Sequence, residues 1–265
     1  MNFDEAIFYK DFQHLWAQAF QKARQCLHVT QAIEMSFSVS LMTLSSHYNL
    51  KGSEMELRVV REALMKMLDP GNIPDFDDWV VGLEVAKENY LRQVYFQGVT
   101  LLWTILEVFV RDLVSLILEF DRTTFASEEF KKIRVSLLDY HRMTKDQQID
   151  HTANLLLNAT YCNRFLGAER FDCILRHVGL AGATGKRLHK KIAEVQQIRN
   201  SFIHNNAVAD RKFIDSCPWL GYREGENIRI SFEDFLKLHK YVLDYIFEVA
   251  RRFDQRYPDA KVIAP

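Results

Sequence analysis

The stretch VYFQGVTLLWTILEVFVRDLVSLILEF, residues Val94–Phe120, decides the fold class of this 265-residue chain. It ends a helix that the sequence predicts from Leu83 to Phe120. Its apolar residues recur at spacings of three and four, the repeat that forms one face of an α-helix. They are Val99, Leu102, Trp103, Leu106, Val110, Leu113, Val114 and Ile117. Because Glu107, Arg111 and Asp112 interrupt the stretch, a membrane span would be too costly, and we expect no membrane association.

Helical periodicity continues on both sides of this stretch. Helices are predicted over residues 3–46 (as one helix or two), 53–68, 126–139, 145–158, 168–178 and 186–204. A last helix begins after Ser231, the expected N-cap with Asp234 behind it, and ends near Tyr257. Only 10 Gly and 5 Pro are present, too few for a fold made of many turns. The sequence therefore predicts an all-α protein.

Two loops and one extended segment complete the predicted layout. The loops cover residues 179–185 and 211–225. The run Asn227–Ile230, which follows two glycines, predicts a short β-hairpin near 219–230 or a single extended segment. The strongest helix breaker is Asp69–Pro74. It divides the chain into an N-terminal helical segment, 1–70, and a helical domain, 83–256.

Charge is balanced over the whole chain but not along it. The formal net charge is -1. Between Arg170 and Lys212, however, nine Lys or Arg residues stand against three acidic residues. This local excess is a suitable footprint for a phosphate backbone, and it is equally what a solvated helix face would carry.

The cysteines and the N-terminus indicate a compartment. The four cysteines show no C-x-x-C pair and no ligand-like spacing with histidine, so free thiols in a reducing compartment are expected; they are Cys26, Cys162, Cys173 and Cys217. Early acidic residues, Asp4 and Glu5, do not fit a signal peptide. We therefore expect a soluble, cytoplasmic protein. Neither His141 nor His151 has the helical spacing of a metal pair, so no metal and no cofactor are predicted.

The segment RNSFIH, Arg199–His204, carries the residues with the clearest chemistry. Arginine can stabilise charge on a phosphate, and histidine can move a proton near neutral pH. On a helical wheel Arg199 falls among Leu188, Ile192, Val195 and Phe202, an expensive place for a lone guanidinium. His204 lies about 140° away around the helix. The pair can meet only if the helix ends or distorts at 203–205, where Asn205 and Asn206 follow, or if two subunits contribute.

The segment Glu194–Asp210, EVQQIRNSFIHNNAVAD, resembles the signature of the HEPN superfamily. These all-α domains carry R-x(4–6)-H, usually with a polar residue after the arginine, as Asn200 is here. The layout after the motif is similar, and the long helix with Trp103 and Glu107 resembles the family's first core helix. The resemblance covers residues 83–256, whereas segment 1–70 resembles no family.

The resemblance implies a metal-independent endoribonuclease of antiviral defence or of a toxin–antitoxin system. His204 would be general base or acid, Arg199 would stabilise the scissile phosphate, and Asn200 would orient one of them. The products would be a 2′,3′-cyclic phosphate and a 5′-OH. Family members usually dimerise, so the expected partners are RNA, a second copy of the chain, and an antitoxin or regulatory protein. Supporting roles fall to Glu107, Arg111 and Asn205, and phosphate contacts to Lys186, Arg187 and Lys190.

Other readings of the same features stay open. The HEPN-like domain could be catalytically silent and bind RNA or a partner protein. The chain could also be a helical scaffold that oligomerises through segment 1–70. Glu107 and Arg111 could simply form a surface i,i+4 pair. The glycine-rich loop Gly179–Gly185 departs from a phosphate-loop motif, although its amides stand at a helix N-terminus and could hold a phosphate.

Overall fold

The computed structural model describes residues 5–49, 76–126, 130, 133–158 and 162–258, and it confirms an all-α fold. The predicted helix 53–68 and the breaker at 69–74 lie outside these residues. The chain divides into two compact units. The first joins residues 1–26 to 96–265, and the second covers 27–95. The N-terminal 26 residues therefore group with the C-terminal part of the chain, a division that differs from segments 1–70 and 83–256.

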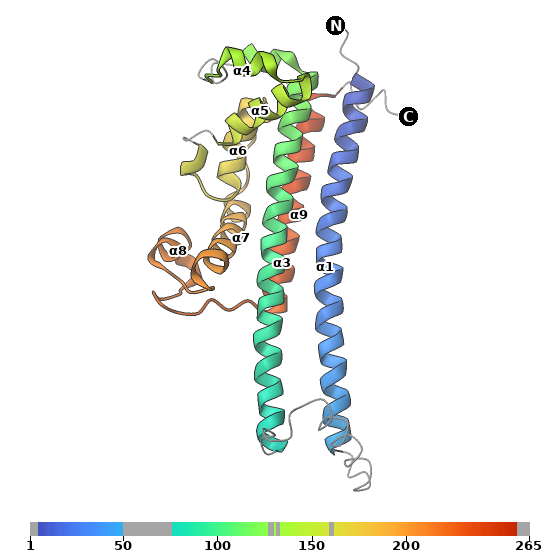
Figure 1. Cartoon of the computed structure of the whole chain (residues 1–265), viewed down its shortest axis with the longest axis vertical. Coiled ribbons are helices and arrows are strands. Elements are labelled where there is room, and N and C mark those ends of the chain that lie inside the picture. Colours follow the sequence, from blue (N-terminus) through green and yellow to red (C-terminus); the bar gives the residue numbers. More distant parts are fainter. Residues whose placement is uncertain (1–4, 50–75, 127–129, 131–132, 159–161, 259–265) are drawn as a thin grey trace. The chain divides into compact units, whose positions relative to one another are not determined.

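The long helices of the chain are α1 (Glu5–Asn49), α3 (Phe76–Phe120) and α9 (Phe232–Arg256). The centre of the first unit is formed by α1 up to residue 26, α3 from residue 96, and α9. Figure 1 shows the first part of α1 beside α3 and α9. The rings of Phe12 and Phe253 stack 3.6 Å apart, and at the other end of this contact His239 Nε2 donates to the carbonyl of Ala23 at 3.0 Å. Residues early in α1 thus meet residues late in α9, so these two helices run antiparallel.

Close packing fixes α3 against α9. A Cβ added at Gly98 would lie 2.6 Å from the ring of Phe235, so only glycine fits this approach. At the far ends of the two helices, Arg256 Nη2 donates to Asp121 Oδ2 at 2.7 Å. The predicted apolar stripe of α3 is buried throughout, from Val99 to Ile117.

Two further helices, α6 (Ala168–His177) and α7 (Lys186–Asn205), cover this centre. The ring of Phe171 in α6 lies between Trp103 of α3, at 5.0 Å, and Tyr245 of α9, at 6.0 Å. Phe202 of α7 stacks on Phe96 of α3 at 5.0 Å. These aromatic contacts hold α7, the helix of the RNSFIH segment, against the bundle.

A buried ionic cluster ties α6 and α7 to α9. Asp172 Oδ1 accepts hydrogen bonds from Arg252 Nη1 at 2.7 Å and from Tyr245 OH at 2.9 Å. Its other oxygen, Oδ2, lies 3.0 Å from His189 Nε2. Burial, together with the Asp172 carboxylate, raises the pKa of the Tyr245 hydroxyl well above its ordinary value. Every strong charge in this cluster has a partner, as burial requires.

The caps of the longer helices follow the sequence. The Ser231 hydroxyl accepts a hydrogen bond from the amide of Asp234, and the Asp234 carboxylate accepts one from the amide of Ser231, so α9 begins with the predicted cap in its reciprocal form. The helix α5 (Lys145–Leu157) has a similar capping box at Thr144. Its bounds, and those of α6, agree with the predicted 145–158 and 168–178 within a residue at either end.

Short elements depart from the predictions. In place of a helix over 126–139 the structure has a 3₁₀ turn, η2 (Arg122–Ala126), no regular structure at 133–136, and the short α4 (Leu137–Arg142). In place of a loop over 211–225 it has α8 (Arg211–Ser216), capped by Asp210, and η5 (Pro218–Leu220). The hairpin near 219–230 is replaced by one isolated bridge between Val208 and Asn227. The segment at 225–228 pairs with 207–209 and not with itself.

The second unit contains the later part of α1 and the earlier part of α3. Within it, burial and the carboxylate of Glu34 raise the pKa of Tyr95. In the part of the chain that the structure describes, no helix combines the length and the apolar character needed to cross a bilayer.

Candidate functional site

Arg199 and Asn200 lie in the C-terminal half of α7 and contact each other directly. Arg199 Nη1 donates a hydrogen bond to Asn200 Oδ1 at 3.0 Å. Both side chains are half-buried. Arg199 Nε is shielded from solvent and has no hydrogen-bond partner among the described residues. An unpaired buried donor is costly, and Arg170 Nε in α6 is unpaired in the same way.

The helical wheel around Arg199 agrees with the sequence. Ile192 and Val195 are buried, and Leu188 and Phe202 are half-buried. Arg199 lies in this sector, but near the end of the helix, where its surroundings are partly open. The guanidinium therefore lies within the apolar sector, close to the C-terminal end of α7, and has no acidic partner among the described residues.

His204 is exposed in the last turn of α7. The helix does not break after Ile203, because it continues to Asn205. Asn206 then takes the left-handed conformation, with φ 51°, that the sequence predicted for this pair of asparagines. On an unbroken helix His204 stands about 140° around from Arg199 and about 7.5 Å along the axis. One chain alone does not bring the two side chains together.

Asn200 lies between Arg199 and His204 around the circumference of α7. It bonds to Arg199, and it precedes His204 by four residues, so it shares that residue's face. Ile203, whose exposed fraction is 46%, lies in the same arc. The result is a continuous surface strip, Arg199–Asn200–Ile203–His204, which we call the α7 strip. It presents a guanidinium, an amide, an apolar side chain and an imidazole on one side of α7.

Asn205 has a structural contact. Its Nδ2 donates to Asp210 Oδ2 at 2.7 Å, while Asp210 Oδ1 accepts from the amide of Phe213. The turn between α7 and α8 is therefore fixed by side chains. Asn205 supports the strip by fixing the end of the helix, and it does not point from it toward Arg199.

The three predicted phosphate ligands lie at the opposite end of α7, and all are exposed. Arg187 lies over the ring of Tyr241 at 5.5 Å, and Lys190 over the ring of Trp219 at 5.0 Å. Lys186 precedes Lys190 by one turn. Lys190 is nine residues from Arg199, so it faces the opposite side of the helix about 14 Å away. These cations could contact a long polyanion, but they do not surround the same phosphate as Arg199.

The predicted pair of Glu107 and Arg111 does not form. Glu107 Oε1 accepts from Arg170 Nη1 of α6 at 3.2 Å, and Arg111 bonds to its neighbour Asp112 at 2.8 Å. Helical spacing permits an ion pair between Glu107 and Arg111, but the Glu107 carboxylate pairs with Arg170 of α6 instead. Neither residue contacts the α7 strip in any interaction of the described chain.

The glycine-rich loop at 179–185 holds arginines of the protein itself. A Cβ added at Gly182 would lie 2.2 Å from Arg252 Nε, and one at Gly179 would overlap the guanidinium of Arg256. Thr184 Oγ1 accepts from Arg252 Nη2 at 2.6 Å. The glycines thus allow close approach of two cationic side chains of α9, and this contact accounts for the loop without a phosphate.

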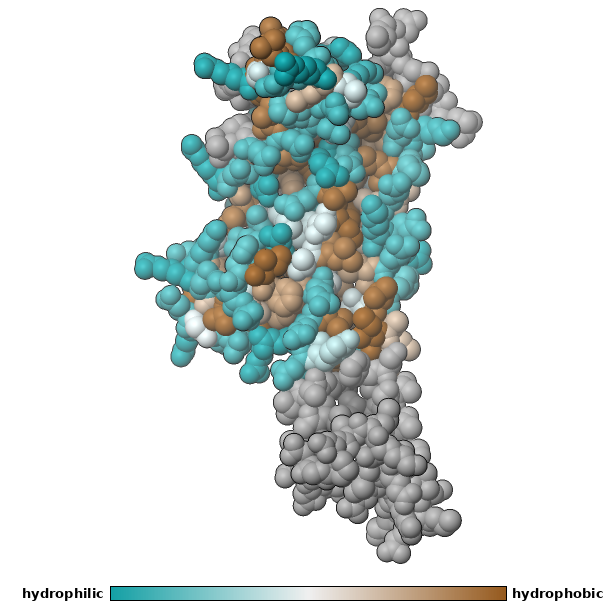
Figure 2. Space-filling view, in the orientation of Figure 1, coloured by the Kyte–Doolittle hydropathy of each residue, from teal (hydrophilic) through white to brown (hydrophobic). Residues whose placement is uncertain are grey.

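Two grooves open on the described surface of the first unit, and neither contains the α7 strip. One, of about 380 Å³, is lined by acidic side chains of α1, α3 and α5, including Asp11, Asp112 and Asp150. The other, of about 200 Å³, is mostly apolar and lies between α1 and α3. Figure 2 shows hydrophobic residues reaching a mainly hydrophilic surface along the line of α3. Within the α7 strip itself, Ile203 and His204 are exposed, whereas Arg199 and Asn200 are half-buried.

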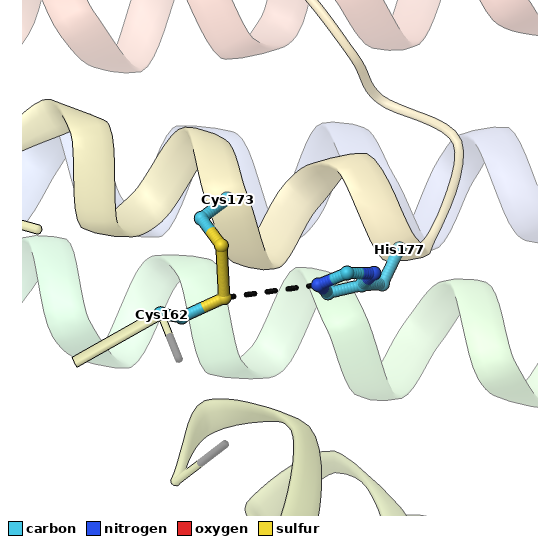
Figure 3. A group of neighbouring side chains, drawn as sticks. All are labelled: Cys162, Cys173 and His177. Carbon is cyan, nitrogen blue, oxygen red and sulfur yellow. Dashed lines mark hydrogen bonds between the residues drawn. A yellow bond between two sulfur atoms is a disulfide. The ribbon is translucent and has the colours of Figure 1, made fainter. Parts of the chain in front are cut away.

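A cluster that the sequence did not predict brings Cys162, Cys173 and His177 together. Cys162 of η4 (Cys162–Arg164) and Cys173 of α6 form a disulfide, which corrects the prediction of four free thiols. His177 Nε2 lies 3.7 Å from Cys162 Sγ. Figure 3 shows the imidazole directed at this sulfur. The spacing Cys173-x3-His177 was a usable signal, because it puts both side chains on one helix face.

Cys217 is a different kind of thiol. It is buried and unpaired. Burial and the nearby carboxylate of Glu194 raise the pKa of the thiol to about 12. Glu194 itself is held by Trp219 Nε1 at 2.6 Å and by Lys191 at 2.7 Å. Cys217 is therefore an unreactive packing residue.

Comparison with known proteins adds no relative. No family model, no curated protein and no solved structure matches the chain.

Proposed function

We propose that this protein is a metal-independent endoribonuclease of the HEPN type, acting in antiviral defence or in a toxin–antitoxin system. The observation that carries the proposal is Arg199. Its Nη1 is oriented by Asn200, and the half-buried side chain has no acidic partner among the described residues. A phosphate oxygen is an acceptor that such a guanidinium recognises well.

The α7 strip contains the groups that the cleavage of RNA requires. The 2′-hydroxyl of a ribose attacks the neighbouring phosphorus while His204, as general base, removes its proton. Arg199 stabilises the additional negative charge on the phosphate oxygens. The bond from phosphorus to the 5′-oxygen breaks, and an imidazolium returns a proton to that oxygen. The products are a 2′,3′-cyclic phosphate and a 5′-OH.

A second copy of the chain completes this site. Arg199 and His204 diverge on one straight helix, so a single strip cannot hold both side chains against one phosphate. Two strips facing each other across a two-fold axis would place Arg199 of one copy near His204 of the other. The exposed Ile203, in the middle of the strip, would be buried in that contact.

Cleavage of labelled RNA in the presence of EDTA tests the proposal. The wild-type protein should cleave, and Arg199→Ala should lower the rate at least about 100-fold because the phosphate loses its main stabilising charge. His204→Ala should lower it by a similar factor. The matched control is Arg211→Ala, which removes another, largely exposed cation of the same basic segment and should leave the rate nearly unchanged.

The outcomes separate the proposal from its rival. Mapping the ends should find 2′,3′-cyclic phosphates. Activity that disappears in EDTA, or that survives in both variants, contradicts the assignment. RNA binding without cleavage would favour a silent RNA-binding domain, for which the cations over Tyr241 and Trp219 are the supporting observation.

A further inference from the structure

The cluster of Cys162, Cys173 and His177 has the composition of a metal site. One ligand atom from each residue, two sulfurs and one imidazole nitrogen, lies within 4.8 Å of the other two. All three residues are buried, with exposed fractions of 0%, 6% and 6%. Figure 3 shows Cys173 and His177 on neighbouring turns of α6, with Cys162 reaching them from η4.

The arrangement contains more than a disulfide needs. A disulfide requires two sulfurs, whereas here an imidazole nitrogen also points at one of them, from 3.7 Å. Ligands of a tetrahedral zinc ion, bound at about 2.3 Å for sulfur and about 2.0 Å for nitrogen, stand roughly 3.5 Å apart. The distance from Cys162 Sγ to His177 Nε2 is already suitable. The two sulfur atoms have to move apart after the disulfide is reduced.

We propose that, once this disulfide is reduced, Cys162, Cys173 and His177 bind one Zn²⁺ ion. A dithiol reductant takes the place of the protein disulfide by exchange, leaving two protein thiols and an oxidised, cyclic reductant. Binding of Zn²⁺ then releases the two thiol protons, and the imidazole adds its lone pair. The three described ligands leave the fourth position to a water molecule.

Charge and hardness both favour zinc in this place. Two thiolates and one Zn²⁺ ion sum to zero charge, and a neutral site avoids the penalty of an unpaired ion in a buried place. Thiolate and imidazole ligands together select zinc over the hard cations Mg²⁺ and Ca²⁺. The site does not depend on the proposed ribonuclease, because it shares no residue with the α7 strip.

Metal titration of the full-length chain tests the site. The protein is reduced with dithiothreitol, exchanged anaerobically into reductant-free buffer, and titrated with Zn²⁺ or Co²⁺. We expect one ion per chain and, with Co²⁺, the charge-transfer absorption of a thiolate–cobalt bond. The oxidised protein should take up none. A reduced wild-type protein that shows no such absorption overturns the proposal, whatever the variants do.

Variants assign the ligands. Cys162→Ser and Cys173→Ser should each abolish tight binding. His177→Gln should weaken it by more than the roughly 10–100-fold that outer-shell partners cost. The matched control is Cys217→Ala, which removes a buried free thiol outside this cluster and should keep full binding. Binding that persists in Cys162→Ser contradicts the assignment, and circular dichroism of each variant confirms that it is folded.

Discussion

Two arginines of this protein show how burial and pairing determine what a guanidinium does. Arg252, with an exposed fraction of 3%, bonds to Asp172, Glu248 and Thr184. Arg199 is half-buried and bonds only to Asn200 among the described side chains. The fully paired Arg252 is a structural residue. The incompletely paired Arg199 is the one to which we assign chemistry.

Replacement of Arg252 should destabilise the protein strongly. Arg252→Met leaves the buried carboxylate of Asp172 without its cation, a loss of about 3–5 kcal/mol in the free energy of unfolding. The measurement is urea denaturation followed by circular dichroism. Arg251→Met is the matched control, because Arg251 bonds to the same Glu248 from an exposed position and should have little effect. If both variants lost the same free energy of unfolding, the buried cluster around Asp172 would not be the source of the stability.

At the scale of the element, the long helices could be predicted and the short ones could not. The apolar repeat of α3 and the cap at Ser231 are local signals, and both were confirmed. The predicted helix over 126–139 was wrong, because residues 133–136 have no regular structure and a helix begins only at Leu137, whose apolar side chain is 68% exposed. The helix α8 was missed because Asp210 was read as the last residue of the segment Glu194–Asp210, whereas in the structure it is also the N-cap of α8.

In the candidate site, too, local features could be predicted and long-range contacts could not. Residue types and the left-handed Asn206 followed from the sequence, because they are local. The disulfide and the pairing of Glu107 with Arg170 did not, because each joins segments that only the tertiary fold brings together. The glycine-rich loop looked like an anion site for the same reason, since the arginines that fill it come from α9.

The loop before α7 should tolerate alanine at one glycine and not at another. Gly182→Ala places a Cβ against Arg252, which three partners hold in place, so we expect a loss of about 1–3 kcal/mol from overpacking. Gly185→Ala is the matched control, since a Cβ there meets no atom within 4 Å. Thermal unfolding of the two variants makes the comparison. If the Gly182→Ala protein were as stable as Gly185→Ala, the close contact between the loop and Arg252 would not contribute to stability.

At the scale of the whole molecule, the proposed enzyme is a dimer with shared sites. If each site takes Arg199 from one copy and His204 from the other, two inactive variants should complement each other. Co-refolded in equal amounts, Arg199→Ala and His204→Ala should recover about a quarter of the wild-type activity, since half of the dimers are mixed and each mixed dimer has one intact site. RNA cleavage by the mixture measures this. A mixture no more active than its components would place both residues in one subunit.

The packing of α1 against α9 also has a consequence for how the protein is made. Tyr9 OH donates to Asp254 Oδ1, and Phe8 and Phe12 contact Phe253, across nearly the whole length of the chain. A ribosome delivers residues 5–26 before it reaches residues 232–256. The aromatic face of α1 therefore stays without its native partner until α9 has been made. The proposed nuclease would thus acquire its folded core, and with it any ability to cut RNA, only after the codons of α9 had been translated.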